Sequence, residues 1–128
     1  MSKRVLILDD EPVTTRTLVL DLSEAGYEVD WASDADEVVR KFRQSAFDLL
    51  IASDRFPGDP DGGELVAACR RARPAAKIVL MTTEGGRAGR VELSETGARV
   101  RKPFDLEEFR DVVARVLETE RQSSGDVT

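Results

Sequence analysis

The chain has 128 residues, of which 41% are hydrophobic and 34% are charged, and its formal net charge is −6. This length and composition predict one soluble globular domain with a substantial core. The negative charge argues against nucleic acid as a partner, because phosphate contacts need a basic surface. The absence of histidine excludes a Ser-His-Asp triad, a histidine phosphotransfer site and a histidine-rich zinc site.

The single cysteine, Cys69, cannot form an internal disulfide, which fits a reducing cytoplasm. We expect it to be a small core residue. Near the N-terminus, Lys3 and Arg4 precede only four apolar residues, a run too short for a signal peptide or a membrane span. We therefore expect a cytoplasmic protein that makes no membrane contact.

Short apolar runs alternate along the chain with segments of helical periodicity. Strands are predicted over residues 5–8, 27–31, 49–53, 77–81 and 98–101. Helices are predicted over residues 13–25, 34–44, 62–71 and 105–120, with a short or loose helix at most in the glycine-rich stretch 85–93. Trp31, at the end of the second predicted strand, is expected to be a packing residue. This alternation predicts an α/β fold with helices on both faces of a parallel sheet.

We expect a single domain over residues 1–121 and a disordered polar tail over residues 122–128. Polar residues follow four of the predicted strands: Asp9 and Asp10 after the first, Ser53 after the third, Thr82 after the fourth and Lys102 after the fifth. Ligands of open α/β sheets bind at the carboxyl ends of the strands, so these side chains are expected to share one pocket. Each of these polar residues alone has an ordinary structural explanation, such as the preference of acidic residues for a helix start. Their occurrence after four strands of one sheet favours a binding site.

The chemistry of this set suits a cation and a phosphoryl group. Two adjacent carboxylates are a plausible Mg²⁺ site, because this ion takes one or two carboxylates and keeps several waters. A hydroxyl group and an ammonium group on the opposite side would suit the oxygens of a phosphoryl group.

From Lys3 to about Glu120 the chain resembles the receiver domain of bacterial two-component response regulators. The matching residues, in order, are Val5-Leu6-Ile7-Leu8-Asp9-Asp10-Glu11-Pro12, Gly26-Tyr27-Glu28-Val29, Phe47-Asp48-Leu49, Arg55-Phe56-Pro57-Gly58 with Asp61-Gly62, Thr82, Gly97-Ala98 and Lys102-Pro103-Phe104-Asp105. The resemblance implies a flavodoxin-like (βα)5 doubly wound sheet with strand order 2-1-3-4-5. It also implies that Asp9, Asp10 and the backbone carbonyl of Arg55 hold Mg²⁺. An aspartate on the third strand would take phosphate from a histidine kinase, and Thr82 and Lys102 would sense that phosphate.

The sequence departs from this family at the phosphoacceptor. The acceptor lies five residues after the position of Asp48 and four before that of Pro57, and both spacings point to Ser53. Asp54 is the alternative acceptor, but it is expected to face away from the pocket unless a bulge turns it inward. A serine phosphate is a stable ester, serine needs a general base, and the metal loses a carboxylate ligand. We therefore expect normal phosphorylation to be lost and any Mg²⁺ to bind weakly.

A second departure precedes Lys102, where the segment is two residues shorter than the family pattern. The position three before this lysine, an aromatic switch residue in the family, is Arg99. Together with Arg87, Arg90 and Arg101, it forms either a small basic patch on the output face for an acidic protein partner or a solvated charged edge.

The leading prediction is a stand-alone, atypical receiver-like protein that is not an enzyme. It would act by binding protein partners, such as a histidine kinase or a downstream signalling protein, and a homodimer is left open. One alternative is a receiver that is still phosphorylated at Asp54 or Ser53. The other is a Mg²⁺-dependent phosphohydrolase, although the first strand lacks the glycine-rich phosphate loop that would support a nucleotide enzyme.

Overall fold

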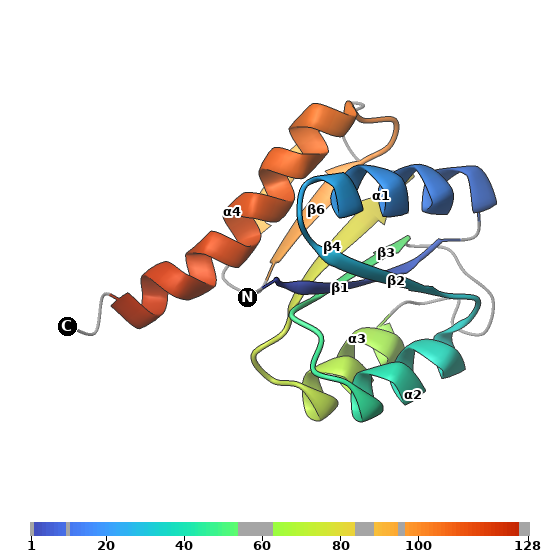
Figure 1. Cartoon of the computed structure of the whole chain (residues 1–128), viewed down its shortest axis with the longest axis vertical. Helices are drawn as coiled ribbons and strands as arrows, with labels where there is room; N and C mark the ends of the chain where they lie inside the picture. Colours follow the sequence, from blue (N-terminus) through green and yellow to red (C-terminus); the bar gives the residue numbers. More distant parts are fainter. Residues whose placement is uncertain (1, 10, 54–62, 84–88, 95–96, 126–128) are drawn as a thin grey trace.

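The computed structural model describes residues 2–9, 11–53, 63–83, 89–94 and 97–125. Within them, a sheet lies between two pairs of helices (Figure 1). The strands are β1 (Arg4–Leu8), β2 (Glu28–Ala32), β3 (Leu49–Ser53), β4 (Lys77–Thr82), β5 (Val91–Ser94) and β6 (Gly97–Arg101). The helices are α1 (Pro12–Glu24), α2 (Ala35–Gln44), α3 (Gly63–Ala72) and α4 (Leu106–Gly125).

The strand order in the sheet is β2-β1-β3-β4-β6-β5. All neighbouring strands are parallel except β5 and β6, which are antiparallel. The predicted α/β fold and the order 2-1-3-4 are therefore confirmed, and β6 takes the place of the predicted fifth strand. β5 is an additional strand at the edge of the sheet.

The prediction of a short helix within residues 85–93 is wrong for its described part, because Val91–Ser94 is β5. In this strand, the apolar residues Val91 and Leu93 alternate with Glu92 and Ser94, which is the period of a strand and not of a helix. Three glycines between residues 85 and 89 also disfavour a helix. The described residues therefore contain four helices in place of the five that a (βα)5 fold implies.

The last helix is longer than predicted. α4 continues to Gly125, and it therefore includes residues 122–125, where the sequence predicts a disordered tail. Glu120, Arg121 and Gln122 are good helix formers, and this propensity extends the helix beyond its last predicted apolar residue. Residues 126–128, the rest of the predicted tail, lie outside the described part of the chain.

Each face of the sheet is covered by its own apolar cluster. Figure 1 shows α1 and α4 on one side and α2 and α3 on the other. On the first side, β1, β3, β4 and β6 pack against helix residues such as Leu22 and Phe109. On the second side, strand residues pack against Phe42 and Cys69. The prediction that Cys69 is a core residue is confirmed, because its side chain is buried.

Gly97 begins β6 at a position that only glycine fits. Its φ is +156°, and a Cβ atom here would lie 1.7 Å from the backbone carbonyl oxygen of Ile78 in β4. The absent side chain therefore allows β6 to pair with β4 at full register.

The helices α2 and α4 both begin after an aspartate whose side chain caps the first turn. The Asp34 carboxylate accepts a hydrogen bond from the Glu37 N–H at 2.9 Å, and Glu37 accepts one from the Ser33 N–H. At α4, Asp105 accepts a hydrogen bond from the N–H of Glu107. None of the helices in the described residues combines the length and apolar character of a membrane span.

Candidate functional site

The register of the sheet brings the predicted site residues to one edge. Leu8 pairs with Ala52, Ser53 pairs with Met81, and Thr82 pairs with Arg101. The residues that end these strands or follow them therefore stand side by side at the carboxyl ends of β1, β3, β4 and β6. They are Asp9, Ser53, Thr82 and Lys102.

Lys102 crosses this edge and binds the carboxylate of Asp9. Its Nζ lies 3.0 Å from Oδ2 and 3.3 Å from Oδ1 of Asp9, and 3.2 Å from Oε1 of Glu11. The Asp9 side chain is fully buried and that of Lys102 is 13% exposed. Two charges withdrawn from water in this way need each other, because each alone would be costly to bury.

The protonation of Lys102 follows from the same contacts. Burial lowers the pKa of Lys102, but hydrogen bonds and attraction from Asp9 and then Glu11 outweigh it, so the pKa is raised above its ordinary value. The lysine therefore stays charged at neutral pH. A permanent cation at this position can hold either a carboxylate or an oxygen of an anion that replaces it.

Ser53 ends β3, and only 1% of its surface is exposed. Thr82 ends β4 and is also buried. The backbone carbonyl of Thr82 accepts a hydrogen bond from the N–H of Lys102 at 2.8 Å, which fixes the two predicted phosphate-sensing residues relative to each other.

The remaining predicted site residues fall elsewhere. Asp10, Asp54 and Arg55 lie outside the described residues, so two predicted metal ligands and the alternative acceptor stay predictions. Arg99 is exposed on β6 and stands opposite Glu92 of β5. This pairing places Arg99 beside the added edge strand β5, away from the strand ends that carry Asp9 and Lys102.

Glu11 was missed as a member of the site. Its backbone N–H donates a hydrogen bond to Asp9 at 3.0 Å, and this turn brings its carboxylate to Lys102. The signal for it was the third acidic residue in the run from Asp9 to Glu11. The prediction that Trp31 is a packing residue is wrong, because the structure leaves 54% of its surface exposed.

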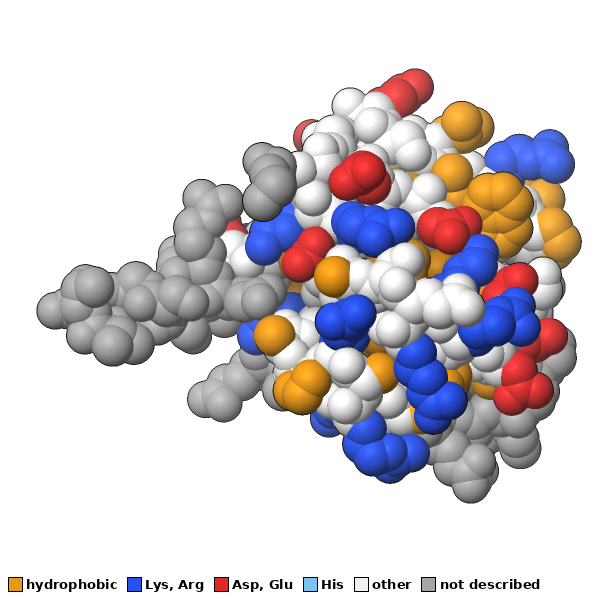
Figure 2. Space-filling model, turned by 60° about the horizontal axis from the view of Figure 1, so that its bottom comes forward, with side chains coloured by type: hydrophobic (Ala, Val, Ile, Leu, Met, Phe, Trp, Pro, Cys, Tyr) orange, Lys and Arg blue, Asp and Glu red, His pale blue; other side chains and the backbone are white. Residues whose placement is uncertain are grey.

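A basic surface was missed as well. Figure 2 shows Lys and Arg side chains gathered on the face that includes α2 and α3. The exposed arginines of these two helices are Arg40, Arg43, Arg70 and Arg71. The net charge of −6 does not reveal this surface, because it sums over the whole chain and does not say where the basic side chains gather.

The fold and this site together define a class of protein. It is a doubly wound α/β protein whose sheet presents a buried carboxylate, two hydroxyl groups and a lysine at the carboxyl ends of its central strands. Residues 5–114 match the family model of the response regulator receiver domain. The chain belongs to this family.

Curated relatives and solved structures agree with this assignment. The chain is 34% identical to the transcriptional regulatory protein ResD of Bacillus subtilis over 125 residues, which are 94% of this chain and 49% of ResD. It is 36% identical to the transcriptional activator protein IrlR of Burkholderia pseudomallei, over 88% of this chain and 48% of IrlR. The chain spans about half the length of the curated relatives it matches.

Two solved structures show the same architecture. The response regulator protein TrrA of Thermotoga maritima, in complex with Mg²⁺ and BeF, is 33% identical, with a TM-score of 0.73 over 89% of this chain and 98% of TrrA. A CheY-like receiver domain protein of Methanospirillum hungatei has a TM-score of 0.80 over 96% of this chain and 99% of that protein. It is 24% identical and supports the fold alone.

Proposed function

We propose that this receiver domain is atypical: it takes part in two-component signalling by binding another protein, and it no longer forms an aspartyl phosphate. The observation that carries the proposal is Ser53, which ends β3 and is buried beside the ends of β1 and β4. An uncharged hydroxyl group stands where the family places its acceptor carboxylate. The proposal includes no enzymatic activity.

Serine differs from aspartate at this position in three physical ways. Its ester with phosphate hydrolyses slowly, whereas an aspartyl phosphate is a reactive acyl phosphate. Its hydroxyl oxygen needs a base to become a nucleophile, and the buried Asp9 is already bound by Lys102 at 3.0 Å. Its oxygen also lies one bond closer to the backbone. A signal carried by rapid gain and loss of phosphate is therefore not expected here.

We expect Mg²⁺ to bind weakly. The described residues offer the carboxylates of Asp9 and Glu11, and the ammonium group of Lys102 competes with a cation for both. Asp10 and the carbonyl of Arg55 would complete the ligand set, with the neutral hydroxyl group of Ser53 where family members supply a charge. A bound Mg²⁺ would supply positive charge for phosphoryl oxygens.

The output surface supports a fixed conformation. Arg99 is exposed at the position of the family's aromatic switch residue, and it lies in a strand that is paired on both sides, with β4 and with β5. Because the Arg99 side chain is already exposed, it does not occupy a buried position from which it could switch outward. We infer that partners meet one form of this surface, whatever the state of the acidic pocket.

The test is an NMR titration of the chain with beryllofluoride and Mg²⁺, which together imitate a bound phosphoryl group. We expect the amide signals of residues 91–94 and 97–101 to stay unchanged, while Ser53→Asp restores a response at the acidic pocket. Thr82→Ala in the Ser53→Asp background is the control for specific occupancy, since it removes a predicted sensing hydroxyl group. A shift of the β5 and β6 signals in the parent chain would contradict the proposal.

A further inference from the structure

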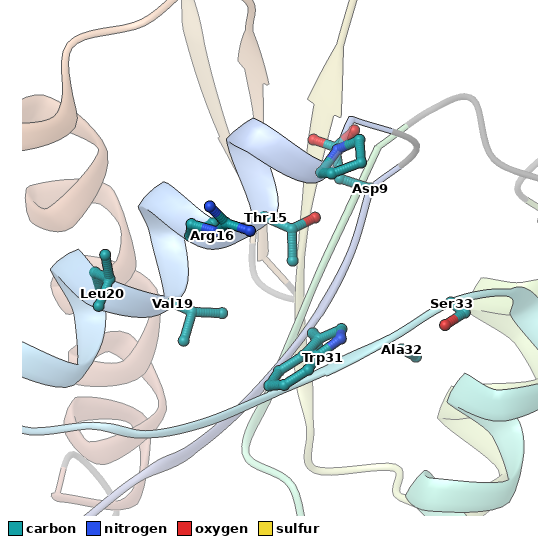
Figure 3. Close-up of a pocket in the computed structure, with 9 residues that line it drawn as sticks. Asp9, Thr15, Arg16, Val19, Leu20, Trp31, Ala32 and Ser33 are labelled. Atoms are coloured by element: carbon teal, nitrogen blue, oxygen red, sulfur yellow. The ribbon is translucent and has the colours of Figure 1, made fainter.

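A cavity of about 640 Å³ lies between α1 and the end of β2. Figure 3 shows Arg16, Val19 and Leu20 of α1 along one wall and Trp31 of β2 on the other. Its volume is within the usual range for small-molecule sites, roughly 300–1,000 Å³. The cavity reaches Asp9, so it adjoins the acidic pocket without belonging to the predicted phosphate site.

The apolar wall is exposed to an unusual degree. Leu20 is 60% exposed and Trp31 is 54% exposed, and both are among the few large apolar residues on the surface of the described residues. Arg16, Val19 and Leu20 follow each other at helical spacing, so one stripe of α1 faces the tryptophan. A flat indole ring beside aliphatic side chains favours a flat apolar partner.

The charged side chain of the cavity lining that is available to a ligand is positive. Arg16 forms no ion pair with any described residue and is exposed. The opposite charge in the lining, Asp9, is bound by Lys102 and its side chain is fully buried. An anion in the cavity would therefore meet an available guanidinium group and a carboxylate that is already neutralised. Guanidinium groups pair with carboxylates and phosphates through two parallel hydrogen bonds.

We propose that this cavity binds a small planar aromatic anion, with its ring against Trp31 and its acidic group on Arg16. The anion is a carboxylate or a phosphate ester, since both match the guanidinium fork. The site does not depend on the chemistry at Ser53. It places a ligand beside Asp9, which also contacts Lys102.

The experiment is an NMR titration of the full chain with 1-naphthoate, 1-naphthyl phosphate and the neutral 1-naphthalenemethanol. The chain has one tryptophan, so the indole N–H of Trp31 gives one signal that reports directly on the cavity. We expect both anions to shift this signal and the amide signals of α1 in a saturable way. The neutral compound should bind about tenfold more weakly, which corresponds to the loss of one charge-assisted pair. The ratio of the two anion affinities distinguishes a carboxylate from a phosphate ligand.

Matched variants at exposed positions sharpen the test. Arg16→Gln should abolish the difference between the anions and the neutral compound, whereas Arg43→Gln on α2 should leave it intact. Leu20→Ser should weaken all three compounds, whereas Val13→Ser should not, because Val13 is 78% exposed on α1 and does not line the cavity. All four residues are exposed, so the fold should tolerate each change, and thermal unfolding verifies this.

Three results would overturn the proposal. They are no shift of the Trp31 signal with any probe, equal affinity for the charged and neutral compounds in the parent chain, and unchanged preference in Arg16→Gln. The first excludes the cavity as a site, and the other two exclude an anion as its ligand.

Discussion

Two regions of the sheet, the strand ends that carry Asp9 and Lys102 and the edge formed by β5, can be compared with the residues expected of a receiver domain. At the carboxyl ends of β1, β4 and β6, the structure brings together Asp9, Thr82 and Lys102, and Ser53 at the end of β3 is the residue that we propose stands at the family's acceptor position. At the other region, the β5 edge, a strand stands where a helix was predicted, and Arg99, the predicted switch position, pairs with Glu92. If the proposal is right, the pocket differs from the family pattern by one side chain, whereas the surface around β5 and β6 differs more extensively.

This difference separates two kinds of constraint. The pocket is held by buried charges that stabilise each other, so its residues are difficult to replace singly. The β5 edge is held by backbone pairing and by one glycine that lets two strands approach. Substitutions in the two regions should therefore destabilise the fold for different physical reasons.

The largest expected effect is at the β5 edge. Gly97→Ala should lower the free energy of unfolding by about 4 kcal/mol, because the new Cβ would meet the backbone carbonyl of Ile78. Urea unfolding measures this loss. Gly26→Ala is the control, since Gly26 has φ +104° with no atom within 4 Å of a Cβ, and it should cost about 1 kcal/mol. Equal losses at the two glycines would show that the close approach of β6 to β4 is unimportant.

The next effect concerns the pocket. Lys102→Met should cost about 3 kcal/mol at neutral pH, because it leaves the Asp9 carboxylate buried without its partner. Adding Asp9→Asn to Lys102→Met should recover most of that loss, since no unpaired charge remains. If the double variant is as unstable as the single one in urea unfolding, the Asp9–Lys102 contact is not what holds the pocket.

Cys69, which lies outside both regions, gives a prediction for the pH dependence of stability. Burial raises the pKa of the Cys69 thiol to about 12, so the folded chain keeps the proton at pH values where the unfolded chain has lost it. Its contribution to stability is complete below about pH 9, and it falls as the pH rises toward 12, by at most about 1.4 kcal/mol per pH unit. Unfolding measured against pH should show this slope in the parent and a shallower one in Cys69→Ala. Equal slopes would contradict the buried thiol.

The smallest effect is again at the β5 edge. Glu92→Lys places a positive charge opposite Arg99 and should destabilise the hairpin by about 0.5 kcal/mol. The double variant Glu92→Lys with Arg99→Glu restores opposite charges and should return to the parent stability. A penalty in the double variant equal to that in the single variant would show that the cross-strand register does not bring these side chains together.

The sequence was informative where a pattern is local. Continuous apolar runs located the buried strands, and residues 49–53 are a strand with the predicted bounds. The polar residues after these runs located the edge where Asp9 and Lys102 meet. The parallel order of the sheet also followed, because strands joined by helices leave few arrangements.

The rest depended on tertiary contacts. The alternation of Val91, Glu92 and Leu93 favours a strand, but only pairing with β6 decides between strand and loop. The exposure of Trp31 could not be predicted, because it depends on how closely α1 approaches β2. Glu11 joins the site through a turn whose geometry has no sequence pattern beyond a third acidic residue.

The central claim is that Ser53 has ended aspartyl phosphorylation while the rest of the pocket is kept. Its most direct test is the intact mass of the chain after incubation with acetyl phosphate and Mg²⁺, with Ser53→Asp as the comparison. We expect no added phosphoryl group on the parent and one on Ser53→Asp. A phosphoryl group on the parent, mapped to Ser53 or Asp54 by peptide analysis, would contradict the account and make the chain a working phosphorylation switch.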